Sequence, residues 1–265
     1  MDIQLLHFLS SIGRIAGIMF VFVYILGPIQ VKFRQSTKVR PPMQPYDPAT
    51  LPPEAASFFY NSVQALVGAG FTVIDYVMKP GAHPLVTPVI VYMVHRTYGD
   101  RVAVACFYST VNGVTTIKNN SIFCQRNFSD GTIVSTTHLP PTGTYGCYKT
   151  RPYVTGTRIS HTSDAAELYR IHCFAVAKHA GHKTALVPPV GGELEAFEES
   201  DADVNNFQVK SGILQLNRTQ TAYVPTWFGA YYMTWSLLWP FKQMRAADSR
   251  AKCRKLMADY ARNVT

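Results

Sequence analysis

The sequence predicts an α+β fold: an antiparallel meander of about five strands with flanking helices. An N-terminal transmembrane helix and a C-terminal aromatic and amphipathic membrane-associated helix are expected to frame it. Three observations lead to this prediction. Apolar runs lie near both ends of the chain, each followed by basic residues. Between them, residues 71–138 hold short β-branched and aromatic segments separated by turn residues. Helical patterns with start and stop signals lie on either side of those segments.

The first element is the apolar run Ile15–Ile29. Extended back to Leu5 or Phe8, the helix reaches about 20 to 25 residues, which is enough to cross a bilayer. The run lacks a basic start, and Gly27-Pro28 leads to charged residues and not to a small-residue cleavage site. Residues 1–34 are therefore predicted to be a retained transmembrane anchor.

A proline-rich linker follows at residues 35–53. Its six prolines favour an extended, semi-rigid spacer. The soluble α+β domain is then expected to span residues 54–221. Its first helix is predicted at Glu54–Gly68, because proline is tolerated before a first turn and apolar residues recur along one face.

Strands are predicted next, each rich in β-branched or aromatic residues. They are Phe71–Met78, Pro88–Arg96, Arg101–Thr110, Ser121–Phe128 and Thr132–His138. Asn112-Gly113 and Ser129-Asp130-Gly131 are hairpin signals between them. Residues 140–160, with several prolines and glycines, are expected to be irregular.

Two more helices are predicted after the strands. One begins at Ser163 or Asp164, with Glu167 as a capping-box partner, and ends at Gly181. The other, Glu193–Ser211, is acidic, and the pattern indicates a solvated face with acids in its first turn. A small hairpin around 217–221 then leads to an aromatic helix at Thr226.

Residues 222–265 are predicted to be a membrane-interface or re-entrant helix with a basic amphipathic tail. Trp and Tyr prefer the headgroup region, so Trp227, Trp235 and Trp239 are predicted membrane-interface residues, together with Lys242 and Arg245. Two alternatives stay open. The aromatic run could be a core helix of the soluble domain, or it could cross the membrane and place the domain outside.

The basic residues also indicate sidedness. Four of them follow the first apolar run with no acids among them, which predicts that the domain lies on the cytoplasmic face of the membrane, in a single-pass or two-pass protein. The net charge of +9 is concentrated beside the apolar runs. That distribution favours anionic lipids and a membrane-protein partner, and argues against nucleic acid.

Candidate catalytic chemistry is sparse, and no catalytic residue and no cofactor are predicted. The best group for a metal is His172, His179 and His182, because His172 and His179 are two helical turns apart on one face. No carboxylate lies on that stretch, and a mixed polar rim explains the residues as well. The five cysteines contain no Cys-x-x-Cys pair and are expected to be unpaired.

These observations favour a membrane-tethered, non-enzymatic accessory or scaffold protein that presents a soluble α+β domain at the membrane surface. Whether the chain is an enzyme is left open, with the balance against it. Two alternatives remain: a membrane-bound hydrolase or metal-dependent enzyme using the histidines, and a domain that binds a lipid or other apolar ligand.

Overall fold

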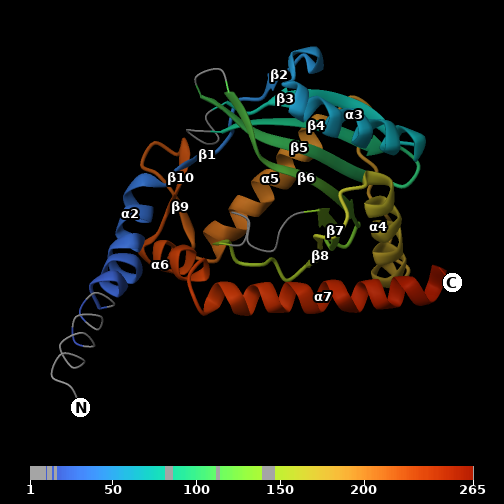
Figure 1. Cartoon of the computed structure of the whole chain (residues 1–265). Helices are drawn as coiled ribbons and strands as arrows, with labels where there is room; N and C mark the ends of the chain where they lie inside the picture. Colours follow the sequence, from blue (N-terminus) through green and yellow to red (C-terminus); the bar gives the residue numbers. More distant parts are fainter. Residues whose placement is uncertain are drawn as a thin grey trace. The chain divides into compact units, whose positions relative to one another are not determined.

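The computed structural model describes residues 10, 14, 17–80, 86–111, 114–138 and 147–264 (Figure 1). They form two compact units. The aromatic unit consists of the described residues within Met1–Val39, Thr144–Lys149 and Asn205–Met244. The sheet unit consists of those within Arg40–Gly143, Thr150–Val204 and Arg245–Thr265.

The sheet unit is built on a seven-stranded sheet with the order β2-β3-β4-β5-β6-β7-β8. Its strands are β2 (Gln44–Pro45), β3 (Thr72–Met78), β4 (Thr87–His95), β5 (Asp100–Val111), β6 (Val114–Asn127), β7 (Ile133–His138) and β8 (Val154–Ile159). Neighbours pair antiparallel except β7 and β8, which are parallel. The α+β class is confirmed.

The prediction of a five-stranded antiparallel meander is wrong, because the sheet is mixed and has a further strand at each edge. The five predicted strands form its middle. The edge strand β2 lies in the proline-rich segment. Pro45 has no amide hydrogen, which is tolerated here because an edge strand pairs on one side only. The edge strand β8 lies in the segment expected to be irregular, where Gly156 packs against Ser135 of β7.

The β5–β6 hairpin is longer than predicted. Val111 pairs with Val114, so β6 begins seven residues before the expected Ser121. The added residues 114–120 are exposed or half-buried and mostly polar. Their own sequence does not indicate a strand, because they become one by pairing with β5. Asn112-Gly113 itself lies outside the described residues. The second turn is confirmed: Gly131 has a φ of 79° and donates its amide to Phe128 O at 3.0 Å.

Two helices cover one face of the sheet. They are α3 (Pro53–Gly68) and α4 (Ala165–Ala180), and their apolar sides join Val91, Val104 and Ile122 in one buried cluster. The predicted start of α4 is confirmed, because Asp164 Oδ1 accepts from the amides of Ala166 (2.9 Å) and Glu167 (3.4 Å).

The other face is covered by the first part of α5 (Glu193–Lys210), the predicted acidic helix. Phe197 packs at 4.3 Å, between ring centroids, against Tyr92 in a second buried cluster. The predicted solvated acidic face is instead partly held in ion pairs. The pairs are Glu193–Arg96, Asp201–Lys79 (2.7 Å) and Asp203–Arg151 (2.7 Å). Acids that look solvated in sequence therefore fasten this helix to the sheet.

The sheet unit also holds most of α7 (Phe241–Val264). Its apolar side packs into the α3–α4 cluster through Leu256, with Cys253, Met257 and Tyr260 beside it. The ring of Tyr260 meets Phe174 of α4 at a centroid distance of 5.6 Å. One end of α4 meets α7 in Figure 1. Leu256, Met257 and Tyr260 of the predicted amphipathic tail thus pack within the protein's own core.

The aromatic unit has a three-stranded antiparallel sheet with the order β1-β10-β9. The strands are β1 (Thr37–Lys38), β10 (Ala222–Pro225) and β9 (Leu214–Leu216). The linker thus contributes an edge strand to each sheet. Beside this sheet lie α2 (Gly27–Arg34) and α6 (Trp227–Ser236), and the π-helical turn η1 (Phe22–Leu26) precedes α2. Thr226 caps α6, accepting from Gly229 N at 2.8 Å.

Candidate functional site

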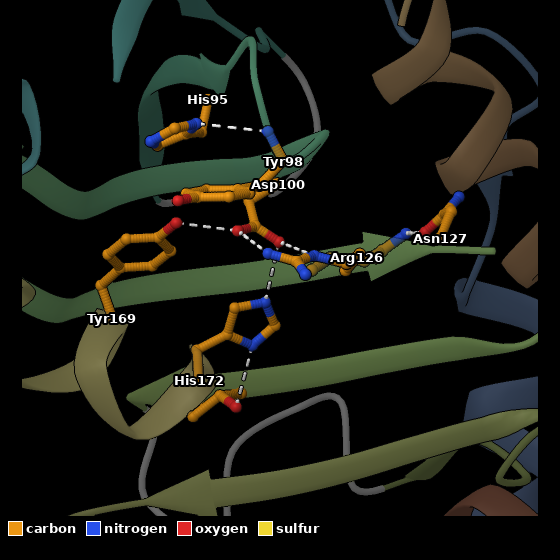
Figure 2. A network of polar contacts seen from close by, with 9 residues as sticks. His95, Tyr98, Asp100, Arg126, Asn127, Tyr169 and His172 are labelled. Atoms are coloured by element: carbon orange, nitrogen blue, oxygen red, sulfur yellow. Dashed lines mark hydrogen bonds and ion pairs between the residues drawn. The ribbon is translucent and has the colours of Figure 1, made fainter. Parts of the chain in front are cut away.

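A buried polar network lies between the sheet and α4 (Figure 2). Its members come from β5, β6, β7 and α4: Asp100, Arg126, Thr136, Tyr169 and His172. Alternate residues of a strand point to one face, so Asp100 lies in phase with the core residues Val102 and Val104. On α4 a spacing of three residues places Tyr169 and His172 on the same side.

Asp100 is the centre of this network. Arg126 donates to both carboxylate oxygens, from Nε at 2.6 Å and Nη2 at 2.5 Å, and the Tyr169 hydroxyl donates to Oδ2 at 2.8 Å. His172 Nε2 lies 3.4 Å from Oδ1, which is an electrostatic contact and not a well-formed hydrogen bond. His172 Nδ1 and the Thr136 hydroxyl are 3.1 Å apart.

The environment shifts the pKa values of the group. Burial alone raises the pKa of Asp100, but the His172 and Arg126 contacts outweigh it and lower the pKa to about 2. Burial and the neighbouring Asp100 carboxylate raise the pKa of the Tyr169 hydroxyl far above its usual range. For Arg126, burial lowers the pKa, and the Asp100 hydrogen bonds more than restore it. The network therefore holds an ionised carboxylate.

The rim of the network is aromatic. Tyr98, about half exposed, stacks on His95 with ring centroids 4.6 Å apart, and the Arg126 guanidinium lies 5.6 Å from the Tyr98 ring centroid. Phe71 meets the Tyr169 ring edge-on at 4.7 Å. These rings cover the charged pair and keep water from it, which strengthens the ion pair.

The order carboxylate, imidazole, hydroxyl is that of a hydrolytic triad. Here, however, the side chains of Asp100 and His172 are 0% exposed, and Thr136 is also fully buried. Asp100 is already held by Arg126 and Tyr169. A substrate carbonyl therefore cannot reach the Thr136 hydroxyl in this conformation. The arrangement ties three strands to α4, and it acts as a structural cross-link.

The histidines considered for a metal do not come together. His172 is buried in the network, whereas His179 and His182 are exposed. Seven residues of helix also separate His172 and His179 by about 10 Å along the axis, too far for one metal ion. Within the described part of the chain, no group of three or more His, Cys, Asp or Glu residues is placed to hold a metal ion.

An open hollow of about 630 Å³ lies between α4 and the end of α7. It is lined by Phe174, Ala177, Lys178, Asp259, Arg262 and Asn263. The single carboxylate of Asp259 pairs with both Lys178 and Arg262 there.

The predicted membrane-interface residues fall into two groups. Trp227, Trp235 and Trp239 belong to the aromatic unit and are 50%, 40% and 70% exposed. Lys242 is exposed at the start of α7, whereas Arg245 is half-buried in the sheet unit. More large apolar side chains of the aromatic unit are exposed: Phe33, Phe228, Leu237, Phe241 and Met244.

Contacts with η1 and α2 fix the orientation of the aromatic segment, residues 227–240. Pro28 has no amide hydrogen to donate to Tyr24 O four residues earlier, and Trp235 Nε1 donates to that oxygen at 3.0 Å. The Tyr24 hydroxyl in turn donates to Trp239 O. Lys32 Nζ donates to Pro225 O at 2.6 Å and lies 5.9 Å from the Trp227 ring centroid. Sequence analysis identified the tryptophans but not these partners.

The stretch Gly17–Arg34 is long and apolar enough to cross a membrane. Its mean hydropathy is 1.4, and only 6% of it is buried. That low burial distinguishes it from a core helix of a soluble protein, while a signal sequence shares its length and composition.

Comparison with known proteins gives no relative: no family model, no curated protein and no solved structure matches this chain.

Proposed function

We propose that this chain is a membrane-tethered, non-enzymatic accessory or scaffold protein that presents its sheet unit at the membrane surface. The observation that carries the proposal is the helix Gly17–Arg34, whose apolar side chains face outward instead of into a core. Ile18, Phe20 and Phe22 are each more than half exposed. An outward-facing apolar surface of this length is stable in lipid and costly in water.

The aromatic segment supports attachment at the membrane surface. The ten residues of α6 rise about 15 Å, half the roughly 30 Å of a hydrocarbon core, so α6 alone is too short to span it. Its exposed tryptophans suit the headgroup region. Arg34, exposed at the end of α2, suits anionic headgroups beside it.

The closed polar network supports a role other than catalysis. The charged groups that resemble a catalytic set are buried and used in holding β5, β6, β7 and α4 together. The acids of α5 that could attract a cation are in part paired with the sheet. A partner, expected to be a membrane protein, would then meet a rigid domain held close to the bilayer.

Membrane fractionation of the full chain tests the tether. We expect the chain to stay with membranes after carbonate washing and its intact mass to include residues 1–34. The double variant Phe20→Glu/Ile25→Glu should move to the soluble fraction. The matched control Val111→Glu/Val114→Glu adds the same charges at exposed apolar residues of the sheet unit and should remain in membranes.

Extraction of the unaltered chain by carbonate would contradict the tether, and an intact mass lacking the N-terminal segment would identify that segment as a cleaved signal sequence. Cross-linking in the membrane tests the accessory role. A discrete cross-linked species with a membrane protein is expected for the full chain and for the Val111→Glu/Val114→Glu control.

A further inference from the structure

The sheet-unit part of α7 has two sides with different environments. Its apolar side, with Leu256 buried and Met257 and Tyr260 beside it, lies in the α3–α4 cluster. That side therefore cannot also enter a bilayer unless the helix leaves the core. Membrane contact through this helix would have to use its other side.

The other side is basic. Residues 245–264 contain six basic residues and two acids. Both acids are already paired: Asp248 lies 2.8 Å from Lys252, and Asp259 is held by Lys178 and Arg262.

Three cations remain on the exposed side. Arg250, Arg254 and Lys255 are exposed, and none of them has an ion pair with any residue that the structure describes. At 100° per residue Arg254 lies about 160° from Leu256 around the helix axis, and Arg250 and Lys255 lie about 120° and 100° from it on either side. Long side chains on an exposed helix side can reach a charged surface without moving the backbone.

We propose that this exposed basic side of α7 binds anionic phospholipid headgroups peripherally, by charge and without insertion. The inference rests on the proposed membrane tether, which brings the helix to a bilayer. Lipid is favoured over nucleic acid for two reasons. The helix begins directly after the aromatic segment, and its aromatic Tyr260 packs on Phe174 and is not displayed among the cations.

The number of cations on α7 that stay unpaired within the described part of the chain sets the expected strength of its binding to anionic lipid. Each basic residue near an anionic surface strengthens binding about fivefold, so three give about a hundredfold. Because the contact is between exposed charges, it should weaken at high salt. Insertion of an apolar helix face would show little salt dependence.

Lysine footprinting of the full chain in nanodiscs tests the surface. The chain is reconstituted in phosphatidylcholine alone or with added phosphatidylglycerol, and a neutral amine-acetylating reagent is read by peptide mass spectrometry. Lys252 and Lys255 are expected to react at least about fivefold more slowly when phosphatidylglycerol is present, and high salt should reverse this. Lys183 and Lys210, exposed and outside α7, are internal controls whose rates should stay constant.

A charge-removal pair makes the test specific. Arg250→Gln/Arg254→Gln leaves both reporter lysines and should lower the docking equilibrium about 25-fold, returning their rates toward the phosphatidylcholine value. The matched control Arg170→Gln/Arg218→Gln removes two exposed cations elsewhere and should leave the protection intact.

Equal reactivity of Lys252 and Lys255 in both lipids would overturn the proposal. So would protection by added duplex DNA in phosphatidylcholine nanodiscs without protection by phosphatidylglycerol. In either case, chain that still resists carbonate washing would show that the tether holds and only the α7 contact fails. Release of the chain from the nanodiscs would instead point to failure of the tether.

Discussion

Asp100 shows how much one residue can determine in this fold. It begins β5 directly after the turn glycine Gly99, where an aspartate looks like part of a loop. In the structure it is fully buried and accepts hydrogen bonds from two elements. A buried carboxylate is stable only when it is fully paired, so the strands and α4 have to converge on it.

Asp100→Asn is expected to lower the free energy of unfolding by about 3 kcal/mol, because the half-buried Arg126 loses its charged partner. The midpoint of chemical unfolding of the purified chain in detergent measures this. Asp248→Asn, which alters an exposed pair on α7, should change the free energy by no more than about 0.5 kcal/mol. Equal effects of the two variants would contradict a special role for the network.

The depressed pKa of Asp100 also predicts a pH dependence. Its folded-state pKa of about 2 lies below the unfolded value, so the unfolded chain binds the proton more tightly. The stabilisation from this group is complete above about pH 4 and is lost as the pH falls toward 2. As the pH is lowered from 6 to 2, the midpoint of chemical unfolding should therefore fall less steeply for Asp100→Asn than for the unaltered chain. Parallel curves would argue against the depressed pKa.

At this scale the sequence is a partial guide. Period-two alternation with Val102, Val104 and Cys106 places Asp100 on the core side of its strand, which is a usable signal of a buried charge. Its partners Arg126, Tyr169 and His172 lie far along the chain. Only the folded sheet shows that they meet.

Among elements, one contact that holds α6 to the helical segment of η1 and α2 is made to a backbone oxygen. The indole of Trp235 donates to Tyr24 O, and Pro28, four residues later, has no amide hydrogen to compete for that oxygen. Trp235→Phe should destabilise this contact by about 1 kcal/mol and raise hydrogen exchange in residues 17–34 of the chain in nanodiscs. Trp239→Phe, a change at an exposed side chain, is the matched control and should leave exchange unchanged. Similar exchange in both variants would contradict the role of the indole hydrogen bond.

The contact between α6 and β9 requires a glycine. A Cβ on Gly229 would lie 1.8 Å from Ile213 O, so the two backbones would have to separate. Gly229→Ala is expected to cost about 3 kcal/mol or more and to expose the aromatic unit to limited proteolysis. Gly68→Ala, at the end of α3, meets nothing within 4 Å and should be neutral or slightly stabilising. A Gly229→Ala chain as resistant as the unaltered one would contradict this packing.

The elements themselves are largely readable from sequence. The starts of α4 and α6 follow from Asp164 and Thr226, whose side chains cap the helices as expected. The edge strands β2 and β8 were missed, because Gln44-Pro45 and a glycine-containing segment become strands only through pairing with β3 and β7. Likewise, nothing local in α5 distinguishes acids that pair with the sheet from acids that face water.

For the whole molecule, the basic residues after the first apolar run predict that the soluble domain, residues 54–221, lies on the cytoplasmic side. With a membrane-impermeant amine reagent, Lys183 and Lys210 should react in inside-out vesicles and be protected in right-side-out vesicles. Detergent should abolish the difference. Reaction from the outer side in intact vesicles would contradict the expected sidedness, and it would support the alternative with two spans.

Sequence alone determined the α+β class, the N-cap of α4, the middle of the sheet and the apolar character of the N-terminal helix. These features depend on periodicity and on neighbours within a few residues. Tertiary structure alone decided three others: the extra edge strands, the burial of Asp100 and His172, and the use of the apolar side of α7 within the core. Each of these three features depends on residues that are distant in sequence. When those residues pair in the fold, water is removed from charged and apolar groups together. The same composition can therefore face lipid, solvent or core until the chain is folded.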